Sequence, residues 1–476
     1  MKKNILLILA KGATLIRNYN NIAGDIDHLS ELSIYGHVAD IVGMLVEITG
    51  LQGGLSVGDL VRIQGRHNQE VLAEVVGFRS GHALVLPFGS LDGVGMGCRA
   101  ELVETDPSIY PTEEWLGRVI NAFAGPADDK GPLPKGEYRY PIHNVPPAAH
   151  DRRRVGGKVD LGVRAMNAFL TCCRGQRMGI FSGSGVGKSA LLSMMARNTD
   201  AEVNVVGLIG ERGREAREFL EDTLGKEGLK RSVIIVATSD EPALTRRQAA
   251  YVTMSVSEYF RDQGKNVLCL MDSVTRFAMA QREIGLSTGE PPASKGYTPS
   301  VFAELPKLLE RAGPGSKSQG DITGLFTVLV EGDDHNEPVA DAVRGILDGH
   351  VVLDRQIAER GRFPAINILK SVSRTMPNCN RAEENDVINK ARKLLATYED
   401  MAELIRLGAY RGGTDVAVDE AIHYYPMIEG FLAQSVEEKC DLEEGYKELY
   451  QMLGFKSKAE LIEVDRPDEK LTDGSD

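Results

Sequence analysis

The amino-acid sequence predicts an α/β core that follows a small antiparallel β-barrel and precedes a helical domain. Short apolar runs interrupted by Gly fill residues 35–102, and such short strands are typical of a barrel. Continuous apolar runs alternate with helical stretches over residues 155–376, as in parallel sheets buried on both faces. Glu, Lys, Leu and Ala dominate residues 380–453, which favours helices.

Individual runs place the elements. The clearest barrel strands are predicted at 36–43, 44–48 and 83–87. The core strands are predicted at 177–181, 203–209, 233–237, 267–271 and 324–330. Pro and Gly at 124–134 and 145–147 cannot sustain a helix or a central strand, so this connector marks a passage between domains. The expected parts are an N-terminal segment 1–33, a barrel 34–105, a core 106–376, a helical domain 377–455 and a flexible tail 456–476.

Composition limits the class of protein. The 476 residues are enough for two or three domains, and 42% hydrophobic with 26% charged residues is ordinary for a globular chain. A formal net charge of −13 argues against general binding to nucleic acid or to anionic membranes. None of the six cysteines forms a C-x-x-C pair, which disfavours zinc and redox motifs and suits the reduced thiols of a cytosolic protein.

The N-terminus allows two interpretations. Lys2 and Lys3 followed by the apolar run 4–10 imitate a short signal peptide, but Lys11 ends the run without a cleavage-type site. The alternative, which we favour, is a short amphipathic segment that docks on a partner or on the body of the protein. No run approaches the roughly 20 apolar residues of a membrane span.

The strongest chemical signal is a glycine-rich turn between an apolar strand and a helix. The residues expected to bind nucleotide there are Gly183, Ser184, Gly185, Val186, Gly187, Lys188, Ser189 and Ala190. The glycines let backbone N–H groups cradle phosphates, Lys188 reaches the β- and γ-phosphates of ATP, and the Ser189 hydroxyl binds Mg²⁺. One departure from the usual G-x-x-x-x-G-K-[ST] pattern is Ser182 in the first glycine position, which could shift the loop geometry or the affinity.

Two carboxylates complete this site. Asp272 ends an apolar strand about eighty residues after the cradle, which suits a second Mg²⁺ contact, direct or through water. Glu211 follows the strand ending at Ile209, and ligands of α/β sheets lie beyond the carboxyl ends of strands. Glu211 can therefore polarise the water that attacks the γ-phosphate. Spacing alone favours the alternative, a solvated charge cluster at the start of a helix near Arg214.

Several segments together resemble the catalytic subunits of rotary and type III secretion ATPases, with the closest likeness to flagellar protein export ATPases. The likeness covers roughly residues 34–453. The segments that carry it are 160–180, 210–215, 258–265, 272–278, 364–373 and 408–415. The resemblance implies a RecA-like P-loop ATPase core between the barrel and the helical domain.

The same resemblance assigns residue roles. Glu211 matches the catalytic glutamate, and Arg374 matches an arginine finger given to the nucleotide of the neighbouring subunit. Phe363 matches an aromatic side chain against which adenine stacks. Arg212 and Arg276 match structural or coupling arginines. By themselves, Phe363 reads as a core residue and Arg374 as a surface charge.

Partners also follow from the resemblance. It implies a homohexameric ring at the cytoplasmic base of an export gate, with only peripheral contact to the inner face of the membrane, and it leaves open whether the free chain is monomeric. A stalk-like protein sits in the pore, chaperone–substrate complexes meet the helical domain, and a regulatory dimer binds the N-terminus. No nucleic-acid partner is expected.

Three functions compete on the sequence. A ring-shaped RNA helicase would want basic pore loops and a nucleic-acid-binding front domain, which the acidic balance disfavours. A rotary ATP synthase divides catalysis between two paralogous subunits, whereas this chain combines a full catalytic set with its own finger, Arg374. A secretion ATPase remains. The sequence of residues 171–180 favours a flagellar system over an injectisome, which stays open as the alternative.

Overall fold

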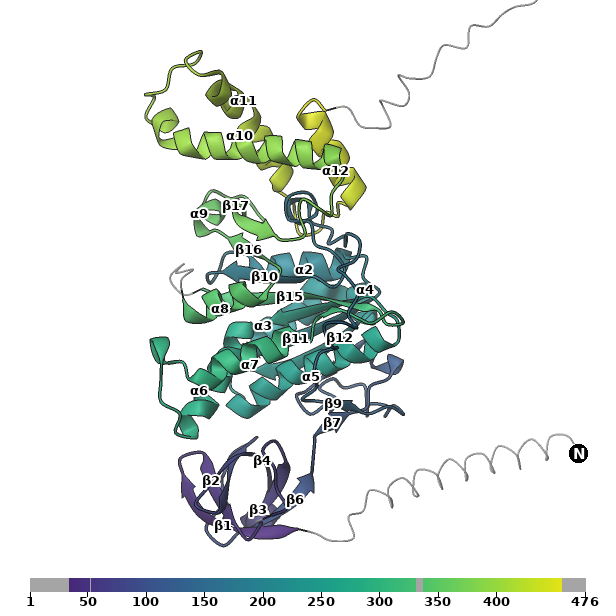
Figure 1. Cartoon of the computed structure of the whole chain (residues 1–476), viewed down its shortest axis with the longest axis vertical. Coiled ribbons are helices and arrows are strands. Elements are labelled where there is room, and N and C mark those ends of the chain that lie inside the picture. The colour runs from purple at the N-terminus through teal and green to yellow at the C-terminus, as the bar shows by residue number, and fades with distance from the viewer. Residues whose placement is uncertain (1–33, 52, 331–336, 456–476) are drawn as a thin grey trace, which may run out of the picture. The chain divides into compact units, whose positions relative to one another are not determined.

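The computed structural model describes residues 34–51, 53–330 and 337–455, and the chain divides into two compact units between Thr105 and Asp106 (Figure 1). The predicted N-terminal segment and tail lie outside the described residues. Each unit is described here by itself.

The first unit is a closed six-stranded antiparallel barrel, as the short apolar runs predict. Its strands follow the order β1-β2-β5-β4-β3-β6, and β6 pairs back to β1. The strand bounds are β1 Tyr35–Val42, β2 Leu45–Thr49, β3 Leu60–Gln64, β4 Glu70–Arg79, β5 His82–Pro87 and β6 Arg99–Glu104. Closure leaves no open edge strand, and alternate apolar side chains such as Val46, Ile48 and Val85 fill the interior.

The second unit is built on a nine-stranded sheet in the order β17-β16-β10-β15-β13-β11-β12-β8, with β14 paired to β15. The strands are β8 Arg118–Ile120, β10 Arg177–Ser182, β11 Val203–Glu211, β12 Ser232–Thr238, β13 Val267–Asp272, β14 Gly313–Pro314, β15 Asp321–Leu329, β16 Gly349–Leu353 and β17 Ile366–Ser373. The pairs among β16, β10, β15, β13, β11, β12 and β8 are parallel, whereas β17 runs antiparallel to β16. All five predicted core strands are present.

Helices cover both faces of this sheet and explain its apolar runs (Figure 1). One apolar cluster packs α2, a π-helical turn at Ala165–Phe169 and the C-terminal helices, and the other packs α5, α6, α7 and α8. The helices of the core are α2 Lys188–Asn198, α3 Gly213–Glu218, α4 Gly225–Lys230, α5 Ala243–Asp262, α6 Val274–Ser287, α7 Pro299–Leu309, α8 Pro338–Ile346 and α9 Arg355–Glu359. Each strand therefore buries side chains on both faces.

The C-terminal region is helical, as its composition predicts, with α10 Ala382–Arg406, α11 Val416–Leu432 and α12 Leu442–Met452. Asp415 and Asp441 cap the last two helices by accepting hydrogen bonds from backbone amides in the first turn. The connector before the sheet holds the short strand pair β7 Ser108–Ile109 and β9 Tyr140–Pro141 and a 3-10 turn at Glu113–Trp115, besides β8. In the described part of the chain, no helix has both the length and the apolar character that a bilayer crossing requires.

Candidate nucleotide-binding and catalytic site

The glycine-rich turn lies between the end of β10 and the start of α2, as predicted. Gly185 and Gly187 have φ of +77° and +91°, left-handed values that a side chain would strain. Gly187 directly precedes α2, so the turn ends on a helix N-terminus, where backbone N–H groups favour an anion. Ser182 is fully buried at the last position of β10 and lies outside the set of positive-φ residues. The backbone at that position therefore does not require glycine.

Three charged side chains predicted from separate parts of the sequence meet beyond this turn. Lys188 Nζ lies 2.5 Å from Asp272 Oδ1 and 3.3 Å from Glu211 Oε1. Asp272 and Glu211 end the neighbouring parallel strands β13 and β11, which brings both carboxylates to one edge of the sheet. The Thr327 hydroxyl on β15 donates a 2.7 Å hydrogen bond to Asp272 Oδ1. Sequence reasoning missed Thr327, whose only signal is its place on the adjacent strand.

Burial and mutual attraction set the charges of this cluster. Burial alone would lower the pKa of Lys188, but the carboxylates of Asp272 and Glu211 outweigh it, so the pKa of Lys188 is raised. The pKa of Glu211 is also raised, first by burial and also by a hydrogen bond with Glu215, while Lys188 opposes the shift. The ammonium group therefore stays charged, as phosphate binding requires.

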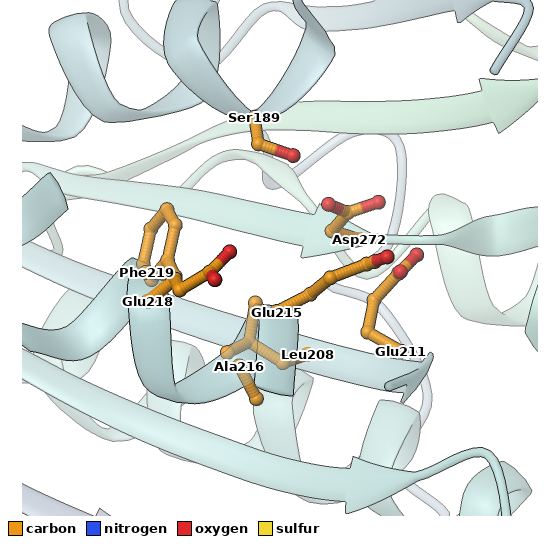
Figure 2. Close-up of a pocket in the computed structure, with 8 residues that line it drawn as sticks. All are labelled: Ser189, Leu208, Glu211, Glu215, Ala216, Glu218, Phe219 and Asp272. Atoms are coloured by element: carbon orange, nitrogen blue, oxygen red, sulfur yellow. The ribbon is translucent and has the colours of Figure 1, made fainter. Parts of the chain in front are cut away.

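A pocket of about 110 Å³ opens beside the cluster (Figure 2). Its lining residues are Ser189, Leu208, Glu211, Glu215, Ala216, Glu218, Phe219 and Asp272. The Ser189 hydroxyl and the Asp272 carboxylate point toward each other across it (Figure 2). Hydroxyl and carboxylate oxygens are the donors that Mg²⁺ prefers, so the lining fits this ion.

Two further carboxylates at the pocket were not assigned a role from the sequence. Glu215 and Glu218 lie on α3 and line the pocket together with Glu211. Their spacing of three residues is the signal that could have found them, because residues three apart share one face of a helix, here α3 directly after Glu211. The Glu215 carboxylate reaches toward Glu211 and Asp272 (Figure 2).

Phe363 lies against the turn. A Cβ built on Gly187 would be 3.3 Å from Phe363 Cδ1, so the ring packs directly over this glycine. Phe363 is nevertheless 46% exposed, which leaves ring surface for another flat group. It precedes β17, whose first residue Ile366 pairs with Leu353 beside Ser182.

Arg374 lies at the opposite end of the same strands. The preceding residue, Ser373, pairs with Gly349, one position before the His350–Gly179 pair, whereas the glycine-rich turn follows Ser182. The separation along β10 is about 13 Å at the usual rise per residue. Arg374 is exposed, and within the described part of the chain its guanidinium donates a single 3.4 Å hydrogen bond, to the Arg344 carbonyl. The predicted finger and the predicted cradle of one chain are therefore not brought together.

The two remaining arginines differ in setting. The Arg212 side chain is 82% exposed and lies 3.9 Å from Glu215. Arg276, at the start of α6, packs its aliphatic carbons on Gly210, where a Cβ would come within 2.9 Å of Arg276 Cβ. Gly210, with φ of +69°, thus permits the close approach of α6 to the end of β11.

Family models match the two halves of the second unit. Residues 162–373 match the nucleotide-binding domain of the ATP synthase alpha/beta family. Residues 381–451 match the T3SS EscN ATPase C-terminal domain. The first match contains the turn, Glu211, Asp272 and Phe363, and the second covers the C-terminal helices.

Relatives extend this similarity over most of the chain. The flagellum-specific ATP synthase of Caulobacter vibrioides is 59% identical over 433 residues, which are 90% of this chain and 98% of that protein. The assembled ATPase EscN of the enteropathogenic E. coli type III secretion system is 40% identical, with a TM-score of 0.83 over 88% of this chain and 100% of EscN. A structure of assembled EscN with its central stalk EscO gives a TM-score of 0.80 over the same shares. The chain therefore belongs to the family of flagellum-specific ATP synthases and type III secretion ATPases, P-loop enzymes that bind and hydrolyse ATP.

Proposed function

We propose that this chain hydrolyses ATP as a homohexameric ring that energises export of flagellar proteins through a type III secretion apparatus. Identity to the flagellar relative is 59%, against 40% to EscN, which supports the flagellar system over the injectisome. The structures of EscN, solved in assembled form and with its central stalk EscO, support a ring with a stalk-like partner.

The site geometry supports the following residue roles within one chain. Lys188 and the amides of the turn bind the β- and γ-phosphates, and the Phe363 ring stacks on adenine. Ser189 and Asp272 hold Mg²⁺, which supplies positive charge to the phosphate oxygens. Glu211 orients and polarises the attacking water, because its carboxylate borders the same pocket as Ser189 and Asp272.

The separation of Arg374 from the glycine-rich turn is the observation that best supports assembly into a ring. Phosphoryl transfer spreads negative charge over the γ-oxygens, and an arginine there is worth about 10³–10⁵ in rate. Arg374 cannot supply positive charge to a γ-phosphate bound by Lys188 of its own chain, since the two residues lie beyond opposite ends of β10. A neighbouring copy of the chain can, so each active site is completed at an interface between subunits.

Cellular placement and the remaining partners belong to the same proposal. The ring works in the cytoplasm and is recruited to the inner face of the membrane beneath an export gate. Chaperone–substrate complexes meet the C-terminal helices, and a regulatory dimer binds the N-terminal segment. Loss of the gene should abolish filament assembly, and a Glu211→Gln copy should fail to restore it; restoration by that copy would refute ATP-driven export.

Arg374→Ala tests the shared site. The variant should bind ATP normally but lose about 10³-fold or more in turnover, since the γ-oxygens lose their trans cation. Mixing it with Lys188→Ala should restore partial activity, because some interfaces then pair an intact cradle with an intact finger. ATP binding and turnover per subunit are measured against protein concentration.

Dilution decides between shared and self-contained sites. Wild-type turnover per subunit should fall as rings dissociate. Arg344→Lys keeps a cation and the backbone carbonyl beside Arg374, so this control variant should show the same fall as wild type. A dilute monomer that hydrolyses ATP at the full rate, with Arg374→Ala unimpaired, would contradict the trans-acting finger.

A further inference from the structure

A short segment of the C-terminal region, Glu429–Glu438, is fastened to three parts of the ATPase core. It comprises the last turn of α11 and the loop that follows. Arg197, near the end of the helix that begins at Lys188, donates a hydrogen bond to the Val436 carbonyl. Arg164, before the π-helical turn, donates to the Ala433 carbonyl at 2.6 Å and pairs with Glu438 at 2.7 Å.

Gln434 is the centre of these contacts. It is 4% exposed, and its side-chain amide is fully used. Oε1 accepts the Arg164 backbone amide at 2.9 Å, while Nε2 donates to the carbonyls of Gly162 and Glu438, both at 2.9 Å. A buried amide satisfied on every side has one permitted placement, so the backbone of Gln434 is fixed with respect to the core.

That fixed backbone in turn holds Phe363. The backbone N–H of Gln434 donates a 2.8 Å hydrogen bond to the Phe363 carbonyl. The preceding residue, Arg362, is 8% exposed; its Nε donates to Glu429 Oε2 at 3.0 Å, and its other nitrogens donate to the carbonyls of Pro364 and Ile366. The end of α11 and the residues just after it therefore fix the backbone on either side of the Phe363 ring, which extends over Gly187.

We infer that Gln434, assisted by Glu429, is a positioning residue for Phe363, and that the C-terminal helical region thereby sets the affinity for the base of the nucleotide. This inference rests on the proposed adenine contact of Phe363. The phosphate cluster of Lys188, Glu211 and Asp272 makes none of these contacts. Loosening Gln434 should consequently weaken binding of the nucleoside part of ATP and leave phosphate binding and chemistry unchanged.

The structure offers a matched control at a second attachment of the same region. Lys158 pairs with Glu384 of α10 at 2.6 Å, and its ammonium lies over the Tyr446 ring of α12. This attachment also joins the C-terminal helices to the core and is comparably buried, but neither Lys158 nor Glu384 contacts Phe363 or its flanking residues. Glu384→Gln therefore reports a general loosening of the C-terminal region.

The experiment compares ATP with inorganic tripolyphosphate, a competitive inhibitor that lacks the nucleoside. In the full chain, Gln434→Ala should raise KM for ATP by about tenfold, with kcat within about twofold and the inhibition constant of tripolyphosphate unchanged. Phe363→Ala should produce the same pattern. The double variant should be no worse than Phe363→Ala alone, because a residue that acts through Phe363 has nothing left to position.

Each outcome has one meaning. If Phe363→Ala leaves KM for ATP unchanged, the adenine contact in the proposed function is wrong. If Phe363→Ala raises KM but Gln434→Ala does not, or the two effects add, the positioning role is wrong. Equal shifts for ATP and tripolyphosphate, or the same shift in Glu384→Gln, would reduce Gln434 to a structural residue. Should Gln434→Ala lose its thermal unfolding transition, Glu429→Gln, which frees Arg362, is judged by the same criteria.

Discussion

The two ends of the parallel strands in the ATPase core treat charge in opposite ways. At the carboxyl ends, Lys188 pairs with both Asp272 and Glu211, and the three side chains are only 8–12% exposed. At the amino ends, Arg374 is exposed, and among the described residues no carboxylate pairs with it. Buried charges must be compensated within the chain, whereas an exposed guanidinium is solvated by water and needs no partner in the same chain.

This difference separates what one subunit can prepare from what assembly must supply. The end proposed to bind phosphate is organised within one chain, because Lys188 already pairs with both Asp272 and Glu211. At the end proposed to hold the finger, the Arg374 backbone amide donates a 2.9 Å hydrogen bond to the Asp348 carbonyl, but no carboxylate of the described residues pairs with the guanidinium. Variants at the first end should damage binding or chemistry in every state of assembly, whereas variants at the second should matter only in the ring.

The largest effect is expected from Lys188→Ala. The change removes the phosphate contact and also leaves Glu211 and Asp272 as uncompensated carboxylates facing an anionic substrate. We expect weaker ATP binding and a loss of about 10³-fold or more in kcat/KM. Steady-state hydrolysis and equilibrium nucleotide binding measure the two effects. Lys230→Ala, at an exposed lysine paired only with Glu227, is the control and should behave as wild type.

Glu211→Gln should separate binding from chemistry. The amide is isosteric with the carboxylate but cannot polarise water as a base, so turnover should fall by about 10²-fold or more while ATP affinity stays nearly intact. Glu221→Gln, on an exposed ion pair with Arg217, is the matched control. Normal turnover in Glu211→Gln would remove this residue from the catalytic role and leave Glu215 as the carboxylate to test.

The sequence predicted the buried strands better than the edges of the sheet. Short continuous apolar runs rich in Val and Ile identify β10, β11, β12, β13 and β15, because strands buried on both faces carry apolar side chains at every position. Strand β8 has only three residues and lies in the Pro- and Gly-rich connector, so no periodicity could reveal it. The antiparallel edge strand β17 alternates buried and exposed residues toward its end, because successive side chains point to opposite faces and only one face is covered there.

The site divides in the same way. Lys188, Ser189 and Asp272 follow from local motifs, because the chemistry of phosphate and Mg²⁺ fixes residue type and spacing. Phe363, which by itself reads as a core residue, is instead 46% exposed, since only the Gly187 side of its ring is covered. Its support by Gln434, seventy-one residues later, joins two elements that no local pattern relates.

The smallest expected effect comes from the two carboxylates that bracket β16. Asp348, at the finger end, accepts the backbone amide and two guanidinium hydrogen bonds of Arg177. Asp354, at the phosphate-binding end, accepts hydrogen bonds from Lys370, Asn367 and the Gln356 amide. They are matched in residue type and flank the same strand, but they support opposite ends of the sheet.

Asp348→Asn should loosen the segment that holds the Arg374 backbone by about 1 kcal/mol, which corresponds to a roughly fivefold fall in ring kcat with ATP affinity unchanged. Asp354→Asn should act at the other end, because it weakens the carboxylate's hydrogen bonds to Asn367 and Lys370 of β17, the strand that follows Phe363. There we expect KM for ATP to rise while kcat holds. Measuring kcat and KM above and below the concentration at which rings form separates the two variants. Identical profiles at both concentrations would show that the two ends do not act independently, and the division of labour between cradle and finger would then have to be abandoned.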